Sequence, residues 1–234
     1  QIPKTRQTLL FSATMPVSIF KLASSHMSLP IHIEVAPQGT TDERVDQEIY
    51  VMKKEDKHIQ LKKILNQYKG LVLVFTRTKH GAKALTKDLK LNNYKATEIH
   101  SNLSFSQRRE SMAGFKNKKY RILVATDIAA RGIDVNDIEL VVNYDLPDSS
   151  EDYVHRIGRT ARAGNIGKAI SFATPDQRRD ILSIERLINK KLNLTKFAEL
   201  EQFNTRPAYS RHNRSARFSR PNSFHSRPNN SRRR

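Results

Sequence analysis

Apolar and polar positions along the chain form short blocks that predict strands and helices in alternation. Leu71–Phe75 and Ile122–Ala125 are apolar at nearly every position, as strands are when both faces of a sheet are covered. Longer segments between such runs have apolar residues at helical spacing. The pattern predicts strands at residues 46–52, 71–75, 95–99, 121–125, 138–143 and 168–173, and helices at 55–67, 79–91, 105–117, 150–158 and 177–191. We therefore expect an α/β domain with a parallel sheet sandwiched by helices.

Ligands of an open parallel sheet bind at the carboxyl ends of its strands. Four segments should gather at that rim: residues 76–78, 100–104, 126–134 and the arginine-rich stretch 151–164. Ser104 has capping-box spacing to Gln107, and Thr78 can cap the next helix. Helix starts present free N–H groups that suit phosphates. Simple capping explains any one of them, whereas several at one edge favour a track for a phosphate backbone.

Residues 1–36 have a weaker pattern of their own. It predicts a strand at Thr8–Phe11, a helix with Ile19, Leu22 and Ala23 inward, and a strand at Ile31–Val35. Two strands and a helix cannot bury their apolar faces alone, so we expect the end of a preceding domain whose beginning is missing. Residues 37–44, rich in Pro, Gly and Thr, are the predicted linker, and the main domain should span 45–202.

Charge changes this picture, because 42 Lys and Arg against 23 Asp and Glu give the chain a net charge of +19. Such a balance predicts a polyanionic partner. Residues 203–234 hold nine arginines, no acidic residue and no hydrophobic periodicity, so we expect a disordered tail. Four aromatic residues among these arginines suit stacking on bases beside phosphate contacts. A tail that only keeps the protein soluble is the alternative.

The chain has no cysteine, which excludes a disulfide framework and a cysteine-based zinc site. No apolar run approaches the roughly 20 residues of a membrane span, and the N-terminus lacks the layout of a signal peptide. We therefore expect a soluble, cytoplasmic protein without a membrane partner.

The stretch 151–164 concentrates basic side chains within eight residues: His155, Arg156, Arg159 and Arg162. On a helix, the first, third and fourth of these share one face, and three such groups require an anion. Gly158 can end the helix, in which case Arg162 reaches the same place from the following loop. A solvated basic face is the alternative, but Ile157 and Ala161 give the stretch a side that can be buried.

Three motifs in this order resemble the C-terminal RecA-like domain of DEAD-box RNA helicases, and the bacterial RhlE-like branch most closely. They are Ser12-Ala13-Thr14, the stretch ATDIAARGID at 125–134, and HRIGRTAR at 155–162, and the resemblance covers about residues 1–190. It implies a RecA-like parallel sheet and one half of an enzyme that uses ATP and Mg²⁺ to unwind short RNA duplexes between two such domains.

The chain lacks the G-x-x-x-x-G-K-[ST] phosphate loop and an Asp-Glu-Ala-Asp sequence. The resemblance therefore places the magnesium ligands in a missing N-terminal RecA-like domain, which becomes a required partner beside RNA. We expect the chain alone to be inactive as an ATPase. A non-enzymatic RNA-binding or chaperone module is the alternative function.

The resemblance also assigns roles around ATP. Arg159 and Arg162 match the arginine fingers that reach the γ-phosphate, which suits a guanidinium because its fork of donors fits phosphoryl oxygens. His155 and Arg156 match relays to the first domain, and an ion pair is the alternative for Arg156. Asp134 matches the residue that binds the ATP ribose, with capping of a turn as its alternative.

Further roles follow by resemblance for the Ser-Ala-Thr motif and for RNA. Ser12 and Thr14 couple ATP hydrolysis to unwinding, with an ordinary helix cap as the alternative. The residues assigned to the RNA sugar-phosphate backbone are Thr76, Arg77, Ser101, Arg108 and Thr126.

Three positions depart from the pattern of that family. Ser101 replaces a common Gly, and Phe105 replaces a Gln whose RNA contact is lost. Phe105 then either packs or touches RNA, and Gln107 is a possible substitute for the missing Gln. Ala161 replaces another common Gly, and we expect little effect because both residues are small.

Overall fold

A computed structural model describes residues 3, 5–12, 15, 17–33, 44–130, 133, 135, 137–162 and 166–196. The chain divides into two units, residues 1–201 and residues 202–234. The predicted linker segment 37–43 and the predicted tail 203–234 lie outside the described residues. All helices and strands of the described residues belong to the first unit.

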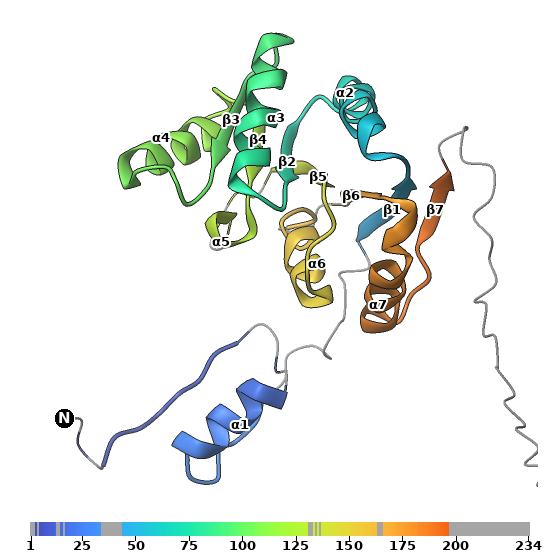
Figure 1. The fold of residues 1–234 in the computed structure, drawn as a ribbon. Helices are drawn as coiled ribbons and strands as arrows, with labels where there is room; N and C mark the ends of the chain where they lie inside the picture. Colours follow the sequence, from blue (N-terminus) through green and yellow to red (C-terminus); the bar gives the residue numbers. More distant parts are fainter. Residues whose placement is uncertain are drawn as a thin grey trace, which may run out of the picture. The chain divides into compact units, whose positions relative to one another are not determined.

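The centre of this unit is a single sheet in which every pair of neighbouring strands is parallel (Figure 1). The strand order is β3-β4-β2-β5-β6-β1-β7. The strands are β1 (Val45–Val51), β2 (Leu71–Phe75), β3 (Ala96–Ile99), β4 (Ile122–Ala125), β5 (Ile138–Asn143), β6 (Gly167–Ala173) and β7 (Asn193–Lys196). The first six confirm the strands predicted between residues 46 and 173.

The helices of the described residues are α1 (Val17–His26), α2 (Lys57–Gln67), α3 (Lys79–Leu91), α4 (Phe105–Lys116), α5 (Asp127–Ala130), α6 (Ser150–Ile157) and α7 (Arg178–Ile188), with 3-10 turns η1 (Lys54–Asp56) and η2 (Pro175–Gln177). The predicted helix starts at the rim are confirmed. Thr78 accepts a hydrogen bond from the Gly81 N–H, and Ser104 forms a complete capping box with Gln107.

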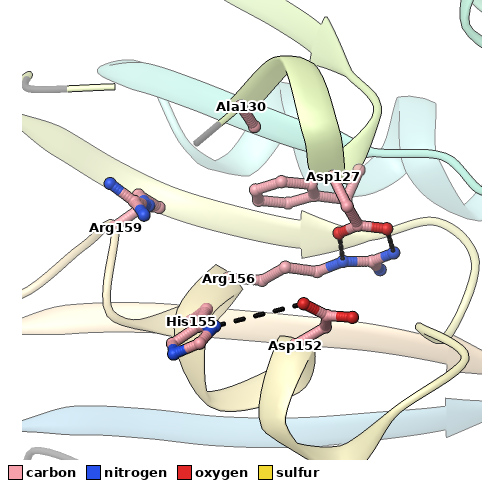
Figure 2. A pocket seen from close by; sticks show the side chains of 7 residues that line it. Asp127, Ala130, Asp152, His155, Arg156 and Arg159 are labelled. Carbon is pink, nitrogen blue, oxygen red and sulfur yellow. Dashed lines mark hydrogen bonds and ion pairs between the residues drawn. The ribbon is translucent and has the colours of Figure 1, made fainter. Parts of the chain in front are cut away.

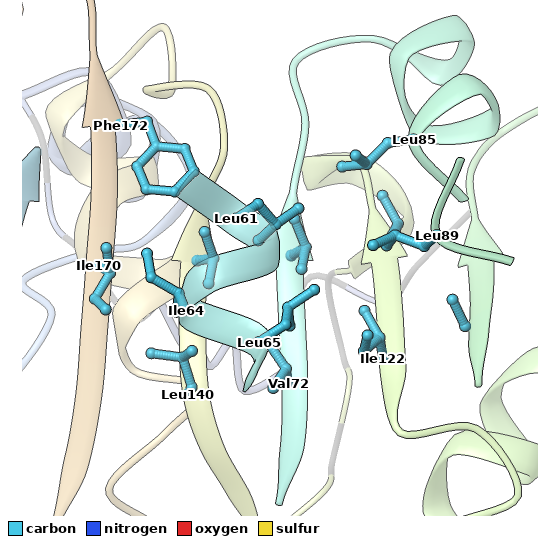
Figure 3. Packing of buried hydrophobic residues seen from close by; sticks show 14 of the residues in the cluster. Leu61, Ile64, Leu65, Val72, Leu85, Leu89, Ile122, Leu140, Ile170 and Phe172 are labelled. Atoms are coloured by element: carbon cyan, nitrogen blue, oxygen red, sulfur yellow. The ribbon is translucent and has the colours of Figure 1, made fainter. Parts of the chain in front are cut away.

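Both faces of the sheet are covered, as the apolar runs predicted. Val72 and Val74 of β2 point to one side, where they pack with buried residues of α2 and α3 such as Leu61 and Leu89 (Figure 3). The alternate residues of β2 point to the other side and pack with Phe115 of α4 and with the alanines of α5. The predicted sandwich of helices around a parallel sheet is therefore confirmed.

The prediction of two strands in the N-terminal segment is wrong for the residues that the structure describes there. Thr8–Phe11 forms no strand, and Leu9 and Phe11 are 67% and 90% exposed. Residues 31–33 also lie outside any strand. A strand needs a neighbour to take up its backbone hydrogen bonds, and none of the described strands pairs with these residues. The predicted helix is confirmed as α1, but of the residues predicted to face inward Ala23 is buried whereas Leu22 is 49% exposed.

The sequence analysis also missed two elements. The short helix α5 follows β4 directly, and β7 adds an edge strand that pairs with β1 in register Ile49 to Leu194. The helix predicted to reach residue 191 ends at Ile188, because Asn189 adopts a left-handed conformation with φ of 49° and stops it.

Candidate functional site

Arg156 joins three elements at the carboxyl end of the sheet. Its side chain projects from α6 and is almost fully buried, at 2% exposure. Nε and Nη2 donate to the two carboxylate oxygens of Asp127 at 2.5 and 2.7 Å (Figure 2). Nη1 donates to the carbonyl of Asp145 at 2.6 Å. The guanidinium also lies 5.0 Å from the centre of the Phe75 ring. The geometry thus gives Arg156 the ion pair that was the alternative to a relay.

Asp127, the partner of Arg156, received no role from its sequence. It is the first residue of α5, directly after Thr126 at the end of β4. The available signal was its place in a rim loop next to a basic stretch. The pairing itself joins residues 29 positions apart, which a local pattern does not reveal.

Arg159 and Arg162 lie beyond the helix and converge on one backbone atom. Helix α6 ends at Ile157 with Gly158 as its C-cap, so the two arginines come from the following turn. Nη1 of each donates to the carbonyl of Ile133, at 3.0 Å from Arg159 and 3.2 Å from Arg162. Burial, and then the neighbouring charge of Arg162, lower the pKa of Arg159. Two guanidinium groups side by side create a concentrated positive charge at this rim.

The turn that carries the two arginines is locked by close packing. Thr160 is buried and its hydroxyl donates to the carbonyl of Ile138 at 2.5 Å. Gly167 lies so close that a Cβ there would be 2.4 Å from Thr160 Oγ1 and 2.6 Å from Ala161 N.

Ala161 has a positive φ of 57°, a conformation that costs a residue with a Cβ about 1 kcal/mol relative to Gly. The expectation of little effect rested on size alone and did not include this backbone cost, and it stays a prediction.

His155 lines a small pocket together with the groups just described. The pocket is lined by Phe75, Asp127, Ala130, Asp152, His155, Arg156 and Arg159. His155 Nδ1 lies 4.0 Å from an oxygen of Asp152, as Figure 2 shows. Its Nε2 is buried and has no hydrogen-bond partner among the described residues. One ring nitrogen near a carboxylate and one unsatisfied nitrogen are an arrangement that can pass a proton or a hydrogen bond onward.

The predicted RNA contacts differ in how they are presented. Thr76 is 1% exposed and its hydroxyl donates to the Thr78 carbonyl at 3.3 Å, so its side chain is turned inward. Arg77 is exposed, with its Nε 3.4 Å from a carboxylate oxygen of Asp148. Thr126 is half-buried, and its carbonyl accepts from the N–H groups of Ala129 and Ala130 in α5.

Two further predicted RNA contacts, Ser101 and Arg108, lie near the start of α4. Ser101 is exposed, and Arg108 is half-buried with a buried Nε that lacks a partner among the described residues. A hydrogen bond of 3.0 Å from Lys79 Nζ to Asn102 Oδ1 ties this loop to the start of α3. The structure therefore brings the starts of α3 and α4 together at the rim, as predicted.

Two predicted site residues, Asp134 and Thr14, lie outside the described residues. Ser12 is exposed. Within the described ranges, no group of three or more His, Asp or Glu side chains could hold a metal ion.

Comparison with known proteins supports the predicted family. Residues 56–164 match the family described as Helicase conserved C-terminal domain. The ATP-dependent RNA helicase DbpA of Bacillus subtilis (strain 168) is 44% identical over 188 residues, which cover 80% of this chain and 39% of that protein. The DEAD-box ATP-dependent RNA helicase RhpA of Helicobacter pylori is 39% identical, again over 39% of its length. The chain thus spans about two fifths of the length of these curated relatives.

Solved structures agree in fold and in family. The E. coli DEAD-box protein SrmB, bound to regulator of ribonuclease activity A, matches at 30% identity with a TM-score of 0.64, over 71% of this chain and 99% of that chain. S. cerevisiae Dbp5 bound to RNA and ADP BeF3 matches with a TM-score of 0.75 at 28% identity, over 83% of this chain and 52% of that chain. The narrower assignment to the RhlE-like branch stays a prediction. The chain belongs to the DEAD-box helicases and contains the C-terminal helicase domain of that family.

Proposed function

We propose that this chain is the C-terminal half of an ATP-dependent RNA helicase and that Arg159 and Arg162 act on the γ-phosphate of ATP. The observation that carries the proposal is the convergence of both guanidinium groups on the Ile133 carbonyl. That carbonyl accepts from both arginines but carries only a partial negative charge. An anion between them would relieve the repulsion that, together with burial, lowers the pKa of Arg159.

The chemistry of phosphoryl transfer explains why two arginines at this place are useful. Negative charge develops on the oxygens of the transferred group, and catalysis depends on positioning and charge stabilisation. The fork of a guanidinium fits such oxygens and stays charged. In nucleotidases, an arginine finger contributes about 1000-fold to 100,000-fold in turnover. A solvated ion pair, worth about 0 to 1 kcal/mol, has no comparable effect.

The remaining parts of the ATP site belong to the N-terminal RecA-like domain, which we infer to be the partner across a cleft. We assign the magnesium ligands to that domain as well. Asp134 is assigned to the ribose, and Ser12 and Thr14 to coupling between hydrolysis and unwinding. The complex of the relative Dbp5 with RNA and ADP BeF3 supports a domain of this fold acting beside nucleotide and RNA.

RNA is assigned to the rim formed by the starts of α3 and α4. Free N–H groups at the two capped helix starts favour phosphates, and Arg77, Ser101 and Arg108 lie at the same edge. Because the contacts address the sugar-phosphate backbone, the proposal predicts little dependence on RNA sequence. No helix in the described ranges combines the length and apolar character needed to cross a bilayer. We assign the protein to the cytoplasm.

The test is the exchange Arg159→Ala in the full-length protein. We expect RNA-stimulated ATP turnover to fall by at least about 100-fold, because charge stabilisation in the transition state is lost, while RNA binding stays nearly unchanged. Arg186→Ala is a matched control, since it removes the same charge from an exposed position in the last turn of α7.

A loss smaller than about threefold for both Arg159→Ala and Arg162→Ala would contradict the proposal. A full-length protein that binds RNA but has no RNA-stimulated ATPase would favour the non-enzymatic RNA-binding module instead.

A further inference from the structure

An open groove runs along one side of α4, next to the rim but outside the pocket of His155 and Arg159. Its floor is apolar and includes the buried side chains Ile99 and Ile133 and the half-buried Met112. Its volume is about 400 Å³, within the range of sites that hold small molecules or parts of larger ligands. The described residues that line it leave this space open.

The charged residues that line the groove are all basic: Arg108, Arg109 and Lys116. None of them forms an ion pair with a described residue, and Glu110, the acidic residue of α4, is not part of the lining. Arg108 keeps its Nε buried without a partner, which is unfavourable unless a ligand accepts from it. Charge and the unsatisfied donor together point to an anionic ligand.

Phe105 stands at the mouth of the groove as the first residue of α4. It is 78% exposed, whereas every other Phe and Tyr described between residues 44 and 196 is buried or half-buried. Burying a Phe side chain is worth about 2 to 3 kcal/mol, so a ligand that covers this ring would gain from the contact. The sequence left two options for Phe105, packing against the protein or contact with RNA. The structure excludes the first, because the ring does not pack.

Gln107, the possible substitute for the missing Gln, has its side-chain oxygen occupied. Its side chain is engaged in the capping box, where Oε1 accepts from the Ser104 N–H at 2.9 Å. The start of α4 therefore presents an exposed aromatic ring at the rim.

We infer that this groove binds one or two nucleotides of single-stranded RNA, with a base stacked on Phe105 and phosphates held by Arg108, Arg109 and Lys116. This inference deepens the proposed function and rests on it. Stacking on an aromatic ring suits any base, because every base has a π face, and it does not depend on counterion release. Phe105 would thus add a base contact that tolerates sequence and salt.

The experiment measures binding of the full-length protein to labelled uridine and adenosine decamers over a series of salt concentrations. Phe105→Ala should weaken binding of both by about 5-fold to 100-fold without changing the slope of log K against log salt. Phe105→Trp should bind at least as well as the original protein. Arg109→Ala should behave differently and reduce the slope by about 0.7, because it removes a phosphate contact.

RNA that carries abasic sites gives the sharpest control. On a fully abasic strand the original protein and Phe105→Ala should bind equally, since no base is left to stack. Phe105 is exposed, so the exchange should leave the unfolding midpoint unchanged, and Arg186→Ala again serves as the control for RNA binding.

Two results would overturn the inference. One is RNA binding by Phe105→Ala within 1.5-fold of the original protein, which would leave the groove to a peptide of a protein partner. The other is a loss of the same size on abasic RNA. In either case, an ATPase that still depends on Arg159 would leave the proposed function standing.

Discussion

Arg156 and Arg159 are three positions apart in one basic stretch, yet their surroundings are opposite. Arg156 is buried and satisfied by a carboxylate, a carbonyl and an aromatic ring. Arg159 has another arginine beside it and donates to a carbonyl. The first arrangement holds the rim together, and the second places two like charges side by side at the rim.

Removing the carboxylate that faces Arg156 should destabilise the domain. We expect Asp127→Asn to lower the free energy of unfolding by about 3 kcal/mol, because it leaves a buried guanidinium without a counter-charge. Urea denaturation followed by circular dichroism measures this. The matched control is Asp148→Asn, which breaks the exposed pair with Arg77 and should cost at most about 1 kcal/mol. Equal losses for the two variants would contradict a structural role for the Asp127–Arg156 pair.

At this scale the sequence predicts residue types and their neighbourhood better than their partners. The spacing of His155, Arg159 and Arg162 predicted that cationic groups gather, and Gly158 correctly indicated that the helix could end before the last arginine. The partner of Arg156 could not be predicted, because it comes from another element 29 positions away and depends on how α5 turns after β4.

The turn after α6 holds Arg159 and Arg162 in a fixed position. Its shape depends on a left-handed residue, Ala161, on the buried hydroxyl of Thr160 and on the absence of a side chain at Gly167. The backbone of β6 therefore determines where the arginines stand.

A methyl group at Gly167 should displace the turn after α6. Gly167→Ala would place Cβ against the Ala161 backbone nitrogen at 2.6 Å, so the turn must shift as a whole. We expect a loss of about 1 to 3 kcal/mol in unfolding free energy and lower ATP turnover in the full-length protein. Gly158→Ala is the control, because its φ of −65° suits any residue and its nearest contact is 3.3 Å. Similar effects of both exchanges would show that the close approach at Gly167 is unimportant.

Helices and strands were predictable where the hydrophobic periodicity was strong and helices cover both faces of the sheet. The runs of β2 and β4 are apolar on both faces, so they indicated a sandwiched sheet correctly. β7 was missed because its sequence, NLTK, is short and polar and becomes a strand only by pairing with β1. The strand predicted at Thr8–Phe11 was wrong for the converse reason, since an apolar segment does not form a strand without a neighbouring strand to pair with.

The charge of the whole molecule is unevenly distributed. Nine of its 42 Lys and Arg residues lie in residues 203–234, where there is no acidic residue. We propose that this segment supplies general affinity for RNA while the rim and the groove along α4 supply position.

Removal of the segment should change the salt dependence of binding. Each phosphate neutralised on single-stranded RNA adds about 0.7 to the slope of log K against log salt. If about five of the nine arginines engage at once, ending the protein after Gln202 should flatten the slope by about 3 to 4. The measurement is a salt titration with several unrelated single strands, and affinity should fall for all of them.

The aromatic residues of that segment provide the control. Changing Phe203, Tyr209, Phe218 and Phe224 to Ala should weaken binding and leave the slope unchanged, because stacking releases no counterions. A slope that survives the truncation, or a loss confined to one RNA, would contradict the proposal.

The order of the strands has a consequence for synthesis on the ribosome. β1 emerges first among the strands but lies between β6 and β7, and its first partner begins at Gly167, 167 − 51 = 116 residues after Val51. At about 5 to 20 residues per second, the nascent strand waits roughly 6 to 23 s with Val45, Ile49 and Val51 unpaired. β1 therefore cannot join the sheet as it is made, although β2, β3 and β4 can pair with one another before β6 exists. β1 joins the sheet only once β6 has been made, and a ribosome-bound chaperone has that interval in which to shield β1.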